Sequence, residues 1–237
     1  QGADMTSTAL RVNDVGIRYR HFKHRGGWVL RGINFHLQEG EVLGVVGRNG
    51  AGKSSLLRAL AGITTPDAGN IERKGSLQAA LLTLNMGFLP HLPCKENVVL
   101  SGMLLGATRT EMEDKFSSIM EFSQLDVSAE QKVGSFSNGM RARLALSTSL
   151  IAAPDIVLID ELLGVGDGEF RETSSRAIRD LITTHRSVVL ITHNLQTLGE
   201  LSDRVLWIDN GSQMALGESA EVLASYKASL RQNEGRK

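Results

Sequence analysis

The sequence predicts an α/β fold with a parallel sheet at its core, and three observations support this prediction. An apolar run at 42–46 leads into a glycine-rich segment that an apolar helical pattern follows, in the order strand, loop, helix. Two more short segments, 156–159 and 187–191, consist mainly of apolar residues and are bounded by polar ones, as buried parallel strands are. A long helical stretch, 96–154, lies between the glycine-rich segment and these two runs. We therefore expect a sheet with a helical insert.

The composition narrows the class of protein. The chain has 237 residues, enough for one large α/β domain or for a core domain with an inserted subdomain. Its 26 lysines and arginines balance 26 aspartates and glutamates, so the net charge does not suggest nucleic-acid binding. No apolar run approaches the roughly 18 residues that cross a bilayer, and the N-terminus lacks the apolar stretch of a secretory signal. We therefore expect any membrane role to come from a partner.

The chain has a single cysteine, Cys94, which excludes an intrachain disulfide and favours a reducing, cytosolic setting. We interpret Cys94 as an ordinary small side chain, because the sequence shows no group that would lower its pKa. We expect Gln1 to Asp4, ahead of Met5, to be left from expression, and the fold to occupy about 5–230 as one domain.

Two strands are expected before the glycine-rich segment. Residues 10–19 alternate loosely between apolar and polar side chains, and residues 29–37 alternate more clearly. We predict that they form an antiparallel pair beside the parallel core. The basic segment between them is expected to be a solvated loop. An aromatic side chain at its start could stack on a planar ring, and Tyr19 is better placed for this than Phe22.

The glycine-rich segment has the pattern G-x-x-x-x-G-K-S, from Gly47 to Ser54. Its glycines allow a tight bend with backbone N–H groups pointing inward, and the helix that begins there adds the positive end of its dipole. Lys53 then supplies a mobile cation to the β- and γ-phosphates of a nucleotide, while the Ser54 hydroxyl can coordinate Mg²⁺. The alternative is a glycine-rich turn before a core helix.

Residues 70–73 are predicted to form a short strand, and 76–84 could continue the sheet. The next stretch, 85–102, contains two prolines and the exposed-looking Phe88 and Leu89. A hydrophobic loop of this kind is a candidate docking surface. A loop packed on its own domain is the open alternative.

The helical stretch carries apolar residues at three-to-four spacing, and its most specific part is FSNGMR at 136–141. Ser137 is predicted to cap the N-terminus of a helix. Asn138 and Gly139 leave N–H groups free to meet an anion at that helix start. Taken alone, the pattern is also that of an ordinary capped helix.

Polar side chains follow both of the later apolar runs. Of the pair Asp160 and Glu161, one carboxylate can hold Mg²⁺ and the other can accept a proton from an attacking water. His193 can donate a hydrogen bond to the γ-phosphate or to that water. The alternatives are a surface carboxylate pair and an incidental histidine. Because open parallel sheets place such residues at one edge, we expect them to lie beside the glycine-rich loop.

The rest of the chain is predicted to complete the fold. An acidic loop leads into a helix at 170–184. The segments 205–209 and 213–216 flank an Asn-Gly pair, which predicts a β-hairpin. A short helix is expected at 219–230, and the last residues are expected to fray.

The order of these motifs resembles that of the ATP-binding cassette (ABC) ATPases over essentially the whole chain, from Leu10 to about Tyr226. The resemblance implies a P-loop NTPase, or RecA-like, core at about 5–95 and 155–216. It also implies an antiparallel β subdomain and an inserted α-helical subdomain at about 96–154. ATP hydrolysis with Mg²⁺ is the activity that it implies.

Matched position by position, the family motifs assign roles to single residues. Asp160 matches the Walker B aspartate, which binds Mg²⁺ together with Ser54, and Glu161 matches the catalytic base. His193 matches the switch histidine, and Tyr19 matches the aromatic residue that stacks on adenine. The other nucleotide contacts that the match implies are Gly47, Asn49, Gly50, Ala51, Gly52, Lys53, Ser54 and Ser55 of the Walker A loop, Ser137, Asn138, Gly139 and Met140 of the signature motif, and Asp167 of the D-loop.

A finer resemblance is to the subgroup that exports lipid-linked polysaccharides, such as O-antigen, teichoic acid and galactan. The segments GRNGAGKS, FSNGMRARLALS and IDELLGVGDGEF carry it. Asn138 and Met140 depart from the glycine and glutamine of the wider family, and the subgroup tolerates both. Leu84 or Asn85 stands near the place of the Q-loop glutamine, which leaves nucleotide sensing by that loop open. Because nothing of domain size follows Leu230, we expect no separate carbohydrate-binding domain.

The resemblance also implies partners. The helical insert carries the signature motif away from the phosphate loop of its own chain, so two copies would pack head to tail as a homodimer. Each ATP would lie between one Walker A loop and Ser137 and Gly139 of the other copy. The surface at 88–102 would contact separate integral membrane permease subunits and hold the chain at the cytoplasmic face of the plasma membrane.

Three alternatives remain at this stage. The transported molecule could be another solute, including a small imported one. A soluble ABC ATPase acting on ribosomes or DNA usually has two cassettes or a long coiled coil, and neither is evident in the sequence. A module that binds ATP without hydrolysis conflicts with the intact set Asp160, Glu161 and His193.

Overall fold

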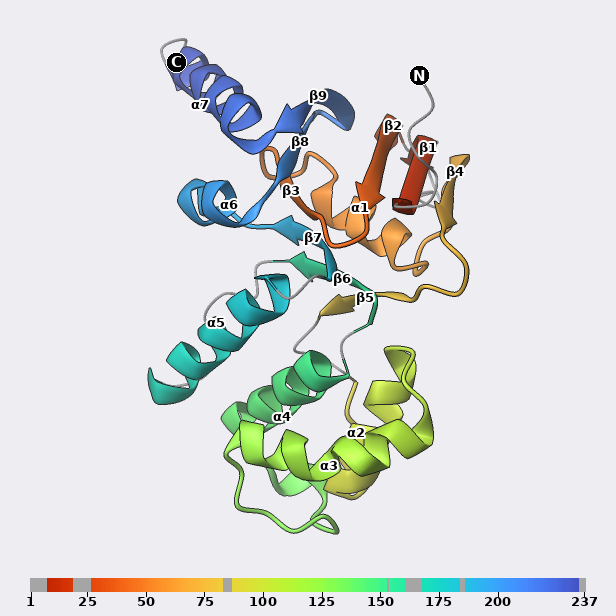
Figure 1. Ribbon diagram of the computed structural model, residues 1–237, viewed down its shortest axis with the longest axis vertical. Coiled ribbons are helices and arrows are strands. Elements are labelled where there is room, and N and C mark those ends of the chain that lie inside the picture. The colour runs from red at the N-terminus through yellow and green to blue at the C-terminus, as the bar shows by residue number, and fades with distance from the viewer. Residues whose placement is uncertain are drawn as a thin grey trace.

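The structure is a computed structural model that describes residues 8–18, 27–82, 87–152, 154–160, 168–183 and 186–234. Nine strands in this part form one sheet in the order β4-β1-β2-β9-β8-β3-β7-β6-β5 (Figure 1). The strands are β1 (Thr8–Arg18), β2 (Trp28–Gln38), β3 (Val42–Val46), β4 (Ala68–Arg73), β5 (Ala79–Leu82), β6 (Ile156–Asp160), β7 (Ser187–Ile191), β8 (Arg204–Asp209) and β9 (Ser212–Glu218). The helices are α1 (Lys53–Leu60), α2 (Cys94–Leu104), α3 (Arg109–Ser123), the 3-10 turn η1 (Val133–Ser135), α4 (Asn138–Ile151), α5 (Gly168–Thr183), α6 (Leu195–Leu201) and α7 (Ser219–Glu234).

Five strands form the predicted parallel core. β3 pairs in parallel with β7 on one side and with β8 on the other, β6 joins β7, and β5 joins β6. The strands predicted at 42–46 and 187–191 are confirmed at both ends. β6 extends one residue beyond the predicted 156–159, because Asp160 still pairs with Ile191. The carboxylate of Asp160 is therefore held by the sheet itself.

The predicted antiparallel pair is also present. β1 pairs antiparallel with β2 and with β4, and β2 joins the parallel core through Arg31 opposite Ser212 of β9. β8 and β9 form the predicted hairpin. Of the predicted stretch 76–84, β5 occupies Ala79–Leu82, because the Leu77 N–H donates to the Lys74 carbonyl at 3.1 Å and forms a turn before it.

Alternating side chains of β3 divide the core into two layers. Leu43 and Val45 pack in the cluster that contains the apolar side chains of α1, β1 and β2. Val42 and Val46 face the other way and pack in the cluster formed by α5, α6 and α7. This alternation is what a strand buried on both faces requires. The glycine-rich loop leaves β3 toward the α1 layer.

The helices α2, α3 and α4 enclose a third apolar cluster, at the end of the molecule far from β1 and β2 in Figure 1. Cys94 is fully buried there, with its Sγ 3.8 Å from Sδ of Met120, and burial raises the pKa of the thiol to about 11. Burial and the raised pKa agree with the interpretation of Cys94 as an ordinary small side chain. Among the described helices, none has both the length and the hydrophobicity to span a membrane.

The loop before α2 only partly matches the prediction of two exposed apolar side chains. Leu89 is 43% exposed, as predicted. Phe88 is half-buried and packs against the cluster of α2, α3 and α4, so that part of the prediction is wrong. The prediction failed because the third cluster covers Phe88, and no local pattern in the sequence reports that contact.

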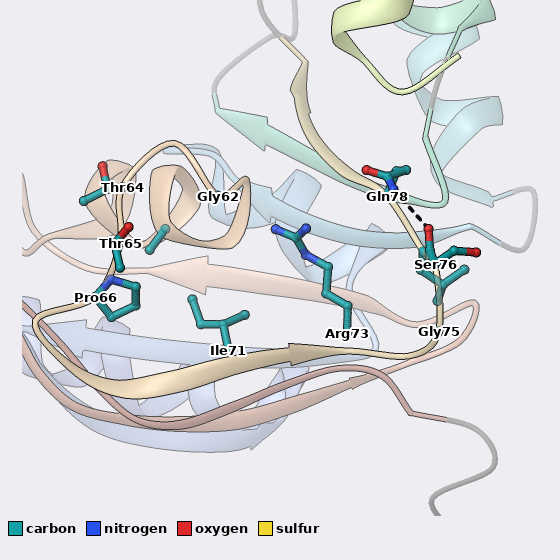
Figure 2. Close-up of a pocket in the computed structure, with 11 residues that line it drawn as sticks. Gly62, Thr64, Thr65, Pro66, Ile71, Arg73, Gly75, Ser76 and Gln78 are labelled. Carbon is teal, nitrogen blue, oxygen red and sulfur yellow. Dashed lines mark hydrogen bonds between the residues drawn. The ribbon is translucent and has the colours of Figure 1, made fainter. Parts of the chain in front are cut away.

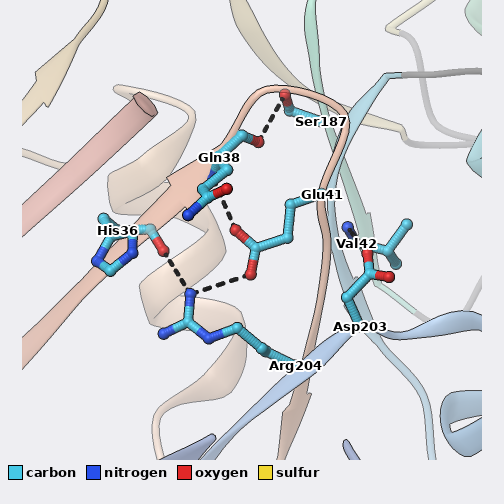
Figure 3. Close-up of polar contacts among 7 residues, drawn as sticks. All are labelled: His36, Gln38, Glu41, Val42, Ser187, Asp203 and Arg204. Atoms are coloured by element: carbon cyan, nitrogen blue, oxygen red, sulfur yellow. Dashed lines mark hydrogen bonds and ion pairs between the residues drawn. The ribbon is translucent and has the colours of Figure 1, made fainter. Parts of the chain in front are cut away.

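Buried polar groups join the strands at the amino ends of β3 and β8 (Figure 3). Glu41 is only 8% exposed, and its Oε1 accepts from Nη1 of Arg204 at 3.0 Å. Its Oε2 accepts from the Gln38 N–H at 2.6 Å. Oδ2 of Asp203 accepts from the Val42 N–H at 2.8 Å. These contacts fix the turn between β2 and β3 against the start of β8.

Candidate functional site

Three neighbouring parallel strands bring the candidate residues to one edge of the sheet. The glycine-rich loop follows β3, Asp160 is the last residue of β6, and His193 comes two residues after β7. β7 lies between β3 and β6, and Asp160 stands opposite Ile191 in the ladder. Crevices outside the carboxyl ends of parallel strands are the usual ligand sites of such sheets. The expected convergence is therefore present for the described residues.

Gly47 and Gly52 of the loop must each be glycine for a different structural reason. A Cβ on Gly47 would lie 2.2 Å from the carbonyl oxygen of Ile208, so only glycine allows the loop to approach β8. Gly52 precedes the first residue of α1 with φ at +103°, which L side chains rarely adopt. A Cβ on Gly52 would also lie 2.5 Å from Cδ2 of Leu30. The loop is thus wedged between β2 and β8.

Those two strand contacts were not anticipated from the sequence. The sequence explains the glycines by a tight bend of the loop, whereas the close neighbours of Gly47 and Gly52 depend on how β2 and β8 are placed in the sheet. Ile208 and Leu30 therefore belong to the surroundings of the loop, although neither is part of a motif.

Lys53 folds back over its own loop. Its Nζ donates to the carbonyl of Gly47 at 2.8 Å and to that of Arg48 at 3.1 Å. Burial lowers the pKa of Lys53, and the negative charge of Asp160 partly opposes that shift. A lysine in this position can exchange carbonyl oxygens for phosphate oxygens, which carry more negative charge.

Ser54 and Asp160 form the second polar contact of the site. The Ser54 hydroxyl donates to Oδ2 of Asp160 at 2.9 Å, although 106 positions separate the two residues in the sequence. A hydroxyl and a carboxylate beside a phosphate loop are hard oxygen donors, and Mg²⁺ is usually bound by one or two protein oxygens together with water and substrate phosphates. The pair fits Mg²⁺ in this manner. Among the described residues, no group of three or more carboxylates, histidines or cysteines forms a metal site by itself.

His193 is exposed at the end of β7. The next residue, Asn194, caps α6, because its Oδ1 accepts from the N–H groups of Gln196 at 3.0 Å and Thr197 at 3.1 Å. The cap fixes the direction in which the chain leaves β7. His193 thereby remains at the same edge as the phosphate loop.

The signature segment begins α4. Oγ of Ser137 accepts from the Met140 N–H at 3.2 Å, which confirms the predicted cap. Oδ1 of Asn138 accepts from Nη2 of Arg141 at 2.7 Å. Ser137, Asn138 and Gly139 are all exposed. In Figure 1, α4 lies with α2 and α3, apart from α1, so the structure does not bring this segment to the phosphate loop of the same chain.

Several predicted residues lie outside the described part of the chain. They are Tyr19, Glu161, Asp167 and the two candidates for the Q-loop position, Leu84 and Asn85. Their roles stay predictions. The contacts of the site that the structure does describe are those of the phosphate loop, Asp160, His193 and the signature segment.

A hollow of about 440 Å³ lies at the other end of α1 and is distinct from the phosphate loop (Figure 2). Gly62, Thr64, Pro66 and Arg73 contribute to its wall. Nη2 of Arg73 donates to the Leu60 carbonyl at 2.7 Å, at the C-terminus of α1. The arginine thus complements the negative end of the helix. The hollow does not share the positive helix end that favours phosphate.

Comparison with curated proteins identifies relatives. A family model described as ABC transporter matches residues 30–164. The chain is 38% identical over 201 residues to the O-antigen export system ATP-binding protein RfbB of Myxococcus xanthus, covering 85% of this chain and 46% of that protein. It is 34% identical to the teichoic acids export ATP-binding protein TagH of Lactococcus lactis, with coverages of 84% and 42%. It is 33% identical to the O-antigen export system ATP-binding protein RfbB of Klebsiella pneumoniae, with coverages of 90% and 86%.

Solved structures agree on the fold. An ATP-binding subunit of an ABC transporter superposes with a TM-score of 0.75 at 22% identity, covering 93% of this chain and 94% of that one. A dimeric ATP-binding cassette in a post-hydrolysis state bound to ADP and Pi gives a TM-score of 0.68 at 19% identity, covering 89% and 98%. The chain spans less than half the length of two of the curated relatives, at 46% and 42%. On the match to the family model and the identity to these relatives, the chain belongs to the ABC transporter family of ATP-binding proteins, with a P-loop NTPase α/β fold.

Proposed function

We propose that this chain is the ATP-hydrolysing subunit of an exporter that moves a lipid-linked polysaccharide across the plasma membrane. The observation that carries the ATPase part is the convergence of Lys53, Ser54 and Asp160 at the shared end of β3 and β6. The transport part rests on relatives named for O-antigen and teichoic acid export, and on the segments that resemble the polysaccharide subgroup.

The phosphate loop binds the β- and γ-phosphates in this proposal. Backbone N–H groups and the positive end of α1 surround the phosphates, and Gly47, Gly50 and Gly52 keep the backbone free of side chains. Lys53 exchanges its hydrogen bonds to the loop carbonyls for bonds to phosphate oxygens. Tyr19 stacks on the adenine ring.

Residues at the ends of β6 and β7 carry the hydrolysis. Ser54 and Asp160 would hold Mg²⁺, which supplies positive charge to the phosphates when bound. Glu161, the residue after Asp160, orients the attacking water and accepts its proton. His193 donates a hydrogen bond to the γ-phosphate and thereby stabilises the charge that develops on it.

The second half of the nucleotide site comes from another copy of the chain. The start of α4 is exposed and lies apart from the phosphate loop of its own chain, so Ser137 and Gly139 are available to a neighbour. Two copies packed head to tail then place each ATP between one phosphate loop and the other copy's signature segment, with Asp167 near the same interface. The similarity to a dimeric cassette supports this arrangement.

The membrane subunits are proposed to bind at α2. Leu100, Met103 and Leu104 are 42%, 45% and 80% exposed, and Leu89 in the preceding loop is 43% exposed. Exposed apolar side chains gathered in this way mark interaction surfaces. An export-system permease is the occupant that the relatives' names imply, and it would hold the chain at the cytoplasmic face of the membrane. The parts about 5–95 and 155–216 would then form the core, and about 96–154 the helical subdomain that docks.

Substitution of Glu161 tests the ATPase proposal. The Glu161→Gln variant keeps the size of the side chain and removes its proton affinity, so it should trap an ATP-bound dimer. Size-exclusion chromatography with light scattering measures the dimer, and phosphate release measures hydrolysis. Hydrolysis by this variant at the wild-type rate would remove Glu161 from the role of base.

Co-purification and loss of the protein test the transport proposal. The expected partner is an integral membrane protein that elutes with the chain after mild detergent extraction. When the chain is lost, a lipid-linked glycan should accumulate in the cytoplasm. Accumulation of another solute, with normal glycan export, would contradict the assigned substrate.

A further inference from the structure

The C-terminal helix α7 covers the face of the sheet opposite α1. It contacts β8 and β9, and Val222, Leu223 and Tyr226 belong to the same buried cluster as Val46 of β3. The phosphate loop starts one residue after Val46. One helix therefore covers the sheet where the loop leaves it, and this helix carries none of the nucleotide-binding motifs.

Tyr226 provides the contact between α7 and the root of the loop. It is 7% exposed, and its ring meets that of Trp207 edge-on, with centroids 5.6 Å apart and planes at 66°. Trp207 lies directly opposite Val46 in the parallel ladder of β3 and β8. The next residue, Ile208, places its carbonyl oxygen where Gly47 has room for no Cβ. Tyr226, Trp207 and Ile208 thus form a continuous packed path to the first residue of the loop.

The Trp207 ring depends on this packing for its position. Its indole Nε1 is buried and has no hydrogen-bond acceptor within the part of the chain that the structure describes. A buried indole normally finds an acceptor that fixes its orientation. Without one, packing orients the ring, and the edge-to-face contact with Tyr226 is the aromatic pair that Trp207 forms among the described residues. Loss of the tyrosine ring would let Trp207 reorient against β3.

Charged residues of the loop and of β8 act on the hydroxyl of Tyr226. Burial raises the pKa of the Tyr226 hydroxyl; the positive charge of Arg48 lowers it, and the negative charge of Asp209 raises it. Arg48 is the second residue of the loop, and its carbonyl accepts from Nζ of Lys53 at 3.1 Å. α7 therefore lies within electrostatic reach of the residue that holds Lys53.

We propose that Tyr226 is a positioning residue, through which α7 holds the root of the phosphate loop in its nucleotide-binding conformation. In this proposal Tyr226 acts through its contact with Trp207 and binds no part of the nucleotide. That the loop binds ATP rests on the proposed function, whereas the support of the loop by α7 is a property of the chain without nucleotide. Loss of the tyrosine ring should weaken nucleotide binding and leave the hydrolysis of bound nucleotide largely unchanged.

Hydrogen exchange of the nucleotide-free protein tests the support directly. The Tyr226→Leu variant keeps an apolar side chain in the cluster and removes the ring contact. The Ala51 amide, which donates to the Arg48 carbonyl at 3.1 Å within the loop, should exchange about five to ten times faster in this variant, as loss of one aromatic pair implies. The matched control is Leu223→Ala on the same helix, buried in the same cluster without that ring contact. It should lower the melting temperature and leave exchange of the Ala51 amide within about twofold of wild type.

Nucleotide binding supplies the second measurement. Tyr226→Leu should raise the Kd and KM for ATP about fivefold with kcat within about twofold, and Tyr226→Phe should restore both constants. Unchanged loop exchange in Tyr226→Leu, or equal acceleration in Leu223→Ala, would overturn the support. Accelerated exchange in a protein that binds no ATP would instead uphold the support and contradict the proposed function.

Discussion

At the carboxyl edge of the parallel strands, Lys53 donates to carbonyls of its own loop, and Ser54 donates to Asp160. Solvent reaches the side chains of both donors. At the amino edge, the buried carboxylate of Glu41, only 8% exposed, accepts from the half-buried Arg204. Both edges have ion or hydrogen-bond partners brought from distant parts of the sequence. The two edges differ in accessibility: at the carboxyl edge a ligand could replace one hydrogen-bond partner, and at the amino edge it could not.

This difference separates function from stability within one sheet. Polar groups that remain accessible can exchange one oxygen partner for another at small cost, since water can replace a lost contact. A buried carboxylate that loses its cation is left uncompensated, and this strongly destabilises the fold. Substitutions at the carboxyl edge should therefore reduce activity with little loss of stability, and those at the amino edge should do the reverse.

Removal of the Lys53 ammonium should give the largest effect at the carboxyl edge. The Lys53→Ala variant is expected to lose about 100-fold or more in kcat/KM for ATP, because it lacks the cation that meets the phosphates. Its melting temperature should stay close to that of wild type, since the ammonium is only partly buried. Phosphate release and calorimetry measure the two quantities. Lys74→Ala, at an exposed ion pair with Glu39, is the matched control and should retain activity. A large loss of stability in Lys53→Ala would contradict the distinction between the edges.

Removal of Arg204 should give the converse result at the amino edge. Arg204→Met leaves Glu41 buried without its cation and should lower the free energy of unfolding by about 3 kcal/mol. The KM for ATP should remain within about twofold of wild type, because β3 keeps its ladder with β7. Denaturant unfolding measures the loss.

A double variant sharpens this result. Glu41→Leu combined with Arg204→Met replaces the ion pair by apolar side chains and should recover at least about half of the loss. No recovery would mean that the destabilisation comes from packing around the arginine stem. In that case the stability of the amino edge would not depend on the pairing of Glu41 with Arg204.

Sequence reasoning succeeded where the determining interactions are local or continuous. The strand at 42–46 has no polar side chain, the strand at 187–191 has four apolar residues after Ser187, and both match the structure. The Ser137 cap depends on a hydrogen bond spanning three residues, and it too was found. Burial of Phe88 depends on how three helices pack, so the sequence could not show it. The contact between Gly47 and Ile208 depends on which strand lies beside β3, which the motif itself does not specify.

A comparison of two helix caps tests whether the start of α4 binds nucleotide. The neighbouring helices α3 and α4 have similar N-terminal caps. Ser137 caps α4 and Thr108 caps α3, where Glu111 completes a capping box. Each substitution by alanine should cost about 1 kcal/mol of stability. Only Ser137→Ala should also lower ATP hydrolysis, by about tenfold, since the proposal places Ser137 against the nucleotide of the other copy. Thermal unfolding and phosphate release, measured on both variants, provide the comparison. Equal activity in the two variants would restrict Ser137 to a structural cap.

The smallest expected effect is the pH dependence of nucleotide binding. Burial lowers the pKa of Lys53 from its ordinary value, and Asp160 only partly opposes this. A base with a lowered pKa gives up its proton at a lower pH than an exposed lysine does, so the nucleotide-free site loses its cation earlier as the pH rises. The Kd for ATP should therefore rise within the alkaline range below about pH 10.4, before an exposed lysine would lose its proton. Lys53→Arg binds more weakly at every pH but should show a flat profile, because a guanidinium keeps its proton throughout this range. A rise of the same size in Lys53→Arg would assign the pH dependence to another group at the carboxyl edge.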